Sequence, residues 1–127
     1  GEMDAIISYA NDKGIGIIPM FDAPGHMQAV VSAMKTLGLT PKYSTPTKSG
    51  GSLNYAIDTT DALSVNFVLA LMQKYVDYFA GKCTMFNIAA DECGFSGMSN
   101  EQYTAYAKFV NSTAAMVQNA GHDCACL

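Results

Sequence analysis

Ile15-Gly-Ile-Ile-Pro-Met-Phe21 is a short, almost unbroken apolar run, followed directly by the turn-prone segment Asp22-Ala-Pro-Gly-His26. Such a run is typical of a parallel strand that is covered on both faces. Residues 2–13 carry apolar side chains at helical spacing before a glycine stop, so we expect a helix that leads into this strand. Residues 27–37 predict a second helix after the turn. The strand therefore ends in a polar loop between two helices.

The second half of the chain has the same organisation. Helical spacing over residues 65–79 is followed by another apolar run, Cys83–Ala89, which ends at Asp91-Glu92. Ser99 and Gln102 form a capping box that starts a last helix, which closes near Gly121. Strands that alternate with helices predict an α/β fold with parallel pairing, in which chemistry gathers beyond the carboxyl ends of the strands. Between the halves, we expect residues 40–52 to form an exposed loop.

Composition excludes several classes of function. The 127 residues carry seven Lys and Arg against eleven Asp and Glu, a net charge of −4, so we expect no nucleic-acid partner. No run approaches the roughly 20 apolar residues of a membrane helix, and no signal peptide is visible at the N-terminus. The four cysteines have neither metal-site nor disulfide-framework spacing, and they predict no metal.

Two polar clusters occupy the predicted strand ends. Asp91 and Glu92 are adjacent acids, whose burial and mutual repulsion can raise one pKa and leave the other group ionised. Asp22 and His26 hold the equivalent place after the earlier strand, where a carboxylate can orient an imidazole toward a neighbouring acid. Each cluster also has a plain structural interpretation, in which the acids cap loops and the histidine packs as a satisfied polar residue.

These two segments carry a family resemblance. Ile18-Pro-Met-Phe-Asp-Ala-Pro-Gly-His26 resembles the segment that ends the third barrel strand of family-20 hexosaminidases, and Asn87-Ile-Ala-Ala-Asp-Glu92 resembles their strand-four signature. Their order and spacing are similar to those of bacterial surface N-acetylglucosaminidases of the streptococcal type. The resemblance implies that residues 1–127 are about half of a (β/α)8 TIM barrel, a partial catalytic domain around strands three and four.

The resemblance also implies an activity. Family members hydrolyse terminal β-linked N-acetylhexosamine from glycans by a substrate-assisted, retaining route, in which the sugar's 2-acetamido oxygen is the nucleophile. By carry-over, Glu92 is the general acid/base and Asp91 orients the acetamido group, while Asp22 and His26 bind substrate or tune Glu92. The partner is then a glycan with terminal N-acetylhexosamine, no cofactor is implied, and the parent protein is expected outside the cell or at its surface.

Departures from the family keep alternatives open. Asn87 stands where many members have His, Ala89 and Ala90 stand where glycine is frequent, and the tail His122–Leu127 does not resemble an apolar fifth strand. A catalytically incomplete fragment or a non-catalytic carbohydrate-binding remnant is therefore a second hypothesis, and open sheet edges would then favour self-association. A metal-assisted hydrolase that uses the same four polar residues is a third.

Overall fold

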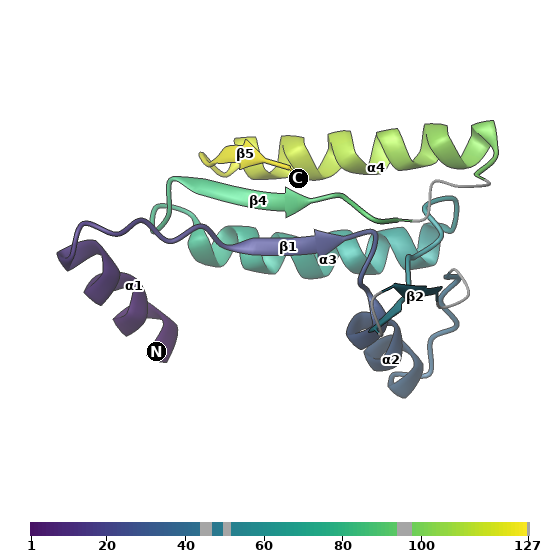
Figure 1. Cartoon of the computed structure of the whole chain (residues 1–127), viewed down its shortest axis with the longest axis horizontal. Helices are drawn as coiled ribbons and strands as arrows, with labels where there is room; N and C mark the ends of the chain where they lie inside the picture. Colours follow the sequence, from purple (N-terminus) through teal and green to yellow (C-terminus); the bar gives the residue numbers. More distant parts are fainter. Residues whose placement is uncertain (44–46, 50–51, 94–97, 127) are drawn as a thin grey trace.

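A computed structural model of the chain describes residues 1–43, 47–49, 52–93 and 98–126. At its centre lies a three-stranded sheet in the order β1, β4, β5, with both pairings parallel (Figure 1). The strands are β1 (Met20–Ala23), β4 (Met85–Ala89) and β5 (Asp123–Ala125). The predicted α/β class with parallel strands is confirmed.

Helices connect these strands, and all four predicted helices are present. They are α1 (Glu2–Asp12), α2 (Gln28–Thr36), α3 (Ala62–Phe79) and α4 (Asn100–Asn119). The N-terminus of α4 has the predicted capping box, in which Ser99 accepts from the Gln102 amide and the Gln102 side chain accepts from the Ser99 amide. At the start of α3, the Asp61 carboxylate accepts from the Ser64 amide at 3.0 Å. Local sequence therefore sets where these helices begin.

The first apolar run is only partly a strand, and the prediction that both its faces are covered is wrong. β1 begins at Met20, and the side chains of Ile15, Ile18 and Met20 are each more than half exposed. Ile15 and Ile18 lie before β1, in a segment without strand structure, and within the described chain β1 itself has only β4 beside it and forms one edge of the sheet. In this chain, therefore, β1 is an apolar edge strand.

The predicted exposed loop at residues 40–52 contains regular structure, which corrects that expectation. β2 (Thr47–Ser49) and β3 (Ser52–Asn54) pair antiparallel, with Ser49 opposite Ser52. The rest of the loop prediction that falls on residues 44–46 and 50–51 lies outside the described residues. Gly-Gly between two short runs is a sequence signal for a two-residue hairpin, and that signal is present at positions 50 and 51.

The C-terminal tail also differs from its prediction, because it forms a strand despite its polar sequence. β5 pairs with β4 in parallel, and the Asp123 amide donates to the Thr84 carbonyl at 2.8 Å. His122 is 4% exposed, with Nδ1 2.8 Å from the Cys83 carbonyl oxygen and Nε2 3.3 Å from that of Val76. Backbone pairing and a buried, hydrogen-bonded imidazole thus stabilise this strand in place of an apolar run.

Two apolar clusters connect the layers. The larger one lies where the sheet, α3 and α4 meet, and Phe86, Met72 and Val117 are at most 1% exposed there. The smaller one underlies the carboxyl end of β1 and joins Met27 and Val31 to α3 and α4. Within the described ranges, no helix combines the length and apolar character that crossing a membrane requires.

Candidate active site

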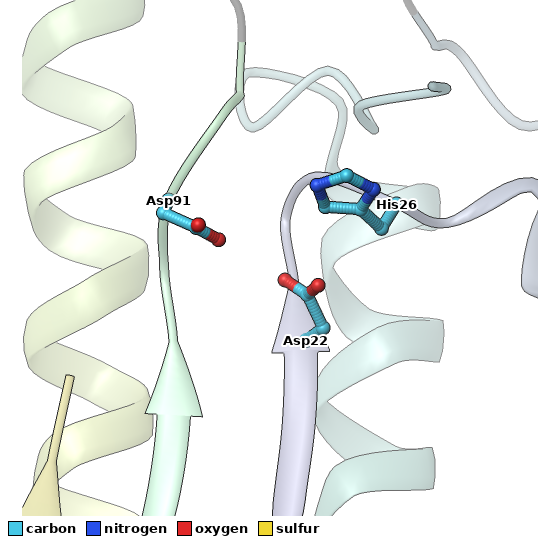
Figure 2. Close-up of side chains that lie close together, drawn as sticks. All are labelled: Asp22, His26 and Asp91. Atoms are coloured by element: carbon cyan, nitrogen blue, oxygen red, sulfur yellow. The ribbon is translucent and has the colours of Figure 1, made fainter. Parts of the chain in front are cut away.

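The two predicted polar clusters meet at the carboxyl ends of neighbouring strands. Asp22 lies in β1, and Asp91 lies two residues beyond the end of β4, its parallel neighbour. Asp22, His26 and Asp91 each present a polar atom within 4.8 Å of the others. Figure 2 shows their side chains directed into the space between the two strand ends. The sequence placed these residues on one rim, and the fold brings them into one group.

Glu92 joins this group through the histidine. His26 Nε2 lies 3.0 Å from Glu92 Oε2, and the Glu92 side chain is 59% exposed. A neutral imidazole with its proton on Nδ1 can accept from a protonated carboxyl, and one with a proton on Nε2 can donate to a carboxylate. The contact therefore accommodates Glu92 both with and without its proton.

A glycine allows the two rim segments to approach closely. A Cβ atom placed on Gly25 would lie 2.9 Å from the carbonyl oxygen of Asp91 and 3.3 Å from that of Glu92. Such contacts are too short for any L-residue unless the backbone moves. Gly25 therefore sets how closely the His26 loop packs against the acidic pair.

The backbone of both segments is conformationally strained. Among the described residues, the non-glycine positions with positive φ are His26 (51°), Ala89 (53°), Ala90 (66°) and Glu92 (42°). Left-handed backbone costs an L-residue about 1–2 kcal/mol, and such residues collect at functional sites, where the surrounding structure holds them. All four lie on the rim that carries the polar group.

Residues 37–61, which connect α2 to α3 and include β2 and β3, form a segment that we call the excursion. The part of the excursion that follows β3 holds the loop that carries His26. The Met27 amide donates to the Tyr55 carbonyl at 2.8 Å, and the Ile57 amide donates to the Pro24 carbonyl at 2.9 Å. These two bonds flank His26 on either side. Tyr55 and Ile57, just beyond the predicted exposed loop at residues 40–52, thus help to position a candidate active-site residue.

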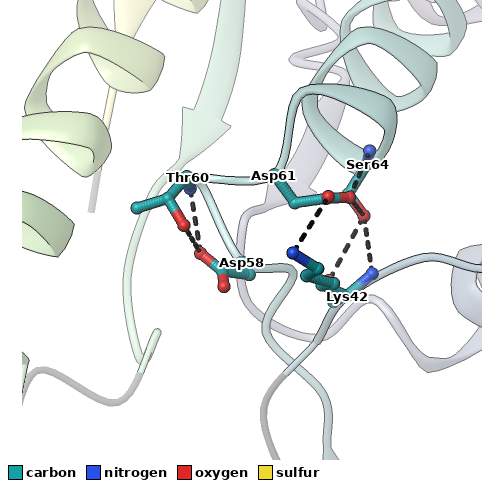
Figure 3. Close-up of polar contacts among 5 residues, drawn as sticks. All are labelled: Lys42, Asp58, Thr60, Asp61 and Ser64. Carbon is teal, nitrogen blue, oxygen red and sulfur yellow. Dashed lines mark hydrogen bonds and ion pairs between the residues drawn. The ribbon is translucent and has the colours of Figure 1, made fainter.

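The base of that excursion is fixed to the start of α3. Ser64 is fully buried, and its hydroxyl accepts from the Lys42 amide at 3.0 Å and lies 2.7 Å from Asp61 Oδ2 (Figure 3). The Asp58 carboxylate next to it accepts from the amide and hydroxyl of Thr60. These bonds close the excursion where it leaves and rejoins the core.

Electrostatics single out Asp22 within the group. Burial raises the pKa of the Asp22 carboxyl, and the nearby Asp91 and Glu92 carboxylates raise it further, while His26 partly offsets them. Its Oδ1 atom is buried and has no hydrogen-bond partner among the described residues. A substrate donor or a proton on this carboxyl would satisfy that atom.

The same geometry bears on the metal hypothesis. Asp22, His26 and Asp91 offer oxygen and nitrogen atoms of the kind that divalent cations take as ligands. However, the His26 nitrogen that faces Glu92 is engaged in a polar contact with its carboxylate. A cation bound through that nitrogen would compete with Glu92 for it.

Comparisons with known proteins identify the chain's relatives. The model of the glycosyl hydrolase family 20 catalytic domain matches residues 1–123. The feline β-hexosaminidase subunit β is 34% identical over 80 residues, which are 61% of this chain and 15% of that protein. Two structures of pneumococcal StrH, described as an exo-β-D-N-acetylglucosaminidase with tandem catalytic modules, each have a TM-score of 0.85, at 32% and 33% identity.

The matched regions cover only part of these relatives. The two StrH superpositions cover 98% of this chain but 31% and 32% of the StrH chains. The strands and helices described above therefore correspond to part of a family-20 barrel, which confirms the predicted fold class. Both rim segments lie within the matched residues.

Proposed function

Because the chain belongs to glycosyl hydrolase family 20, we propose that it carries the catalytic carboxylates of an enzyme that hydrolyses terminal β-linked N-acetylhexosamine. The observation that supports this best is the meeting of Asp91 and Glu92 with Asp22 and His26 at adjacent strand ends. In parallel sheets this rim is where catalytic side chains gather. By the same resemblance, the protein acts outside the cell or at its surface.

Glu92 is the general acid/base in this proposal. Its exposed side chain can reach a glycosidic oxygen, and His26, 3.0 Å away, can exchange a proton or a hydrogen bond with it. Glu92 first gives its proton to the leaving oxygen and later takes one from the attacking water. The imidazole supports both states because it can donate or accept.

Asp91 orients the internal nucleophile. Ionised, it accepts a hydrogen bond from the acetamido N–H, and its charge stabilises the positive charge that develops on that group. The sugar's own acetamido oxygen attacks the anomeric carbon, so the protein supplies no covalent nucleophile and the anomeric configuration is retained. Asp22, with its raised pKa, adds a group at the same rim that can remain protonated.

The test measures release of p-nitrophenol from the N-acetyl-β-glucosaminide by the natural full-length protein. Glu92→Gln and Asp91→Asn should each lower kcat by about 10²–10⁴-fold, because each removes a charge or proton that the transition state requires. Glu101→Gln, an exposed acid in the first turn of α4, is the matched control and should leave kcat unchanged. Full activity of Glu92→Gln would refute the assignment.

Three further measurements test the alternatives and the stereochemistry. Dialysis against a chelator should not change the rate, whereas a loss that a divalent cation restores would favour the metal-assisted hydrolase. Binding of N-acetylglucosamine without hydrolysis, by calorimetry on the unmodified protein, would favour the carbohydrate-binding remnant. NMR of the first product formed should show the β-anomer, as retention requires.

A further inference from the structure

We propose that Tyr106 is a positioning residue that holds the backbone presenting Asp91 and Glu92 to the substrate. The inference rests on the proposed function, since it assigns a role at the same site. Tyr106 lies in α4, outside both sequence segments that resemble the family. Its hydroxyl contacts Ala90, which lies 16 positions earlier in the chain.

The Tyr106 hydroxyl contacts the chain on both sides of the acidic pair. It donates a hydrogen bond to the carbonyl oxygen of Ala90, the residue immediately before Asp91. The Cys93 thiol, which belongs to the residue immediately after Glu92, is near enough to the same hydroxyl that each group affects the pKa of the other. The Tyr106 side chain on α4 therefore lies against the chain on both sides of the Asp91-Glu92 dipeptide.

The backbone at this point needs such support. Ala89 and Ala90 both have positive φ, and each is a non-glycine residue that pays the steric cost of left-handed backbone. The Asn87 side-chain oxygen accepts from the Ala89 amide at 2.8 Å, which fixes the start of this turn. Tyr106 fixes the end of this turn, because its hydroxyl donates to the Ala90 carbonyl oxygen. Without the hydroxyl, Ala90 can relax toward ordinary backbone angles and turn Asp91 away from its position.

Packing alone does not account for the tyrosine. Tyr106 belongs to neither of the two apolar clusters, and its hydroxyl is directed at polar atoms of the strand-end segment. A phenylalanine at this position would keep the ring and remove only the hydroxyl. The substitution Tyr106→Phe thus separates a positioning role from a space-filling one.

The experiment compares Tyr106→Phe with Tyr78→Phe in the natural full-length protein. Tyr78 is the matched control, because its hydroxyl donates to Asp4 at 2.9 Å, a contact between α3 and α1 away from the rim. Tyr106→Phe should lower kcat by about tenfold, with KM within about twofold, because a small displacement of a catalytic group acts on the reacting geometry. Tyr78→Phe should keep the wild-type kcat.

Two substrates identify the carboxylate that is displaced. Ala90 adjoins Asp91, which acts on the acetamido group of every substrate, so Tyr106→Phe should slow a dinitrophenyl and a methyl N-acetyl-β-glucosaminide equally. Glu92→Gln should slow the methyl glycoside far more, because only its poor leaving group requires a proton. A Tyr106→Phe loss confined to the methyl glycoside would overturn the assignment through Asp91.

The remaining outcomes also decide the proposal. If Tyr106→Phe has the kcat of Tyr78→Phe while Glu92→Gln is inactive, the proposed function stands and the role of Tyr106 is wrong. If Glu92→Gln hydrolyses the methyl glycoside at the wild-type rate, the proposed function fails and the role of Tyr106 fails with it. If Tyr106→Phe does not fold, the hydroxyl acts on the whole domain, and the positioning role is likewise overturned.

Discussion

Removing the hydroxyl of Ser64 should loosen the excursion that holds the His26 loop. Ser64 is fully buried, and Ser64→Ala would leave the Lys42 amide without the acceptor that now lies 3.0 Å away. The substitution removes three partly buried hydrogen bonds of this hydroxyl, to the Lys42 amide, the Lys42 carbonyl and Asp61, each worth about 0.5–1.5 kcal/mol. The Asp61 carboxylate still accepts from the Ser64 amide at 3.0 Å, so it loses only the hydrogen bond from the Ser64 hydroxyl. We therefore expect the free energy of unfolding to fall by about 2 kcal/mol.

The assay is urea unfolding followed by circular dichroism, with Ser112→Ala as the control. The Ser112 hydroxyl also donates to a backbone carbonyl, that of Lys108 at 2.8 Å, but it is exposed. Its loss should change stability by less than about 0.5 kcal/mol. Hydrogen exchange should also accelerate at Tyr55 and Ile57 in Ser64→Ala. Equal stabilities for the two variants would refute the reasoning.

The effect of Ser64→Ala should depend on pH with a definite sign. Hydrogen bonds from the Ser64 hydroxyl and amide lower the pKa of Asp61 below its ordinary value of 3.8. A carboxyl with a lowered pKa stabilises the folded state fully above that ordinary value and loses its contribution as pH falls through the folded pKa. The stability difference between wild type and Ser64→Ala should therefore shrink as the pH falls below this ordinary value of 3.8.

Three other predictions address the rim, the cysteines and the sheet edge. Gly25→Ala should lower kcat about hundredfold, because its Cβ would press on the Asp91 carbonyl, whereas Gly16→Ala, with open space around it, should not. At pH 8, maleimide should label exposed Cys126 before Cys93, which is 4% exposed and whose pKa burial raises to about 11, as mass mapping of the labelled peptides would show. The apolar edge of β1 should cause this 127-residue chain to self-associate, and a monomer in light scattering would contradict this.

Local signals in the sequence were sufficient for the four helices and for strands β1 and β4. The Ser99 capping box and the apolar spacing of residues 65–79 act within a turn or two of the helix, so neighbouring residues alone specify them. β5 was missed because its stability comes from pairing with β4 and from His122 bonding to distant carbonyls. Contacts of that range leave no periodic pattern in the strand itself.

The candidate site, like the fold, could be predicted from the sequence only in part. Position after an apolar strand was enough to place Asp22, His26, Asp91 and Glu92 on one rim, and the structure brings them together. Helical spacing places Tyr106 on the apolar face of its helix, but such spacing reports which face a residue lies on and not what its hydroxyl contacts. The one local signal for close approach was the Pro-Gly turn, which indicated a bend but not the neighbouring backbone.

The rim therefore depends on elements that do not carry its functional groups. His26 is held by Tyr55 and Ile57 from the excursion, and the acidic pair is held by Tyr106 from α4. Because strained backbone relaxes unless such contacts over-determine it, the carboxylates alone do not define a working site. A chain with both rim segments but without the excursion or the α4 tyrosine would keep the sequence signature and lose the geometry.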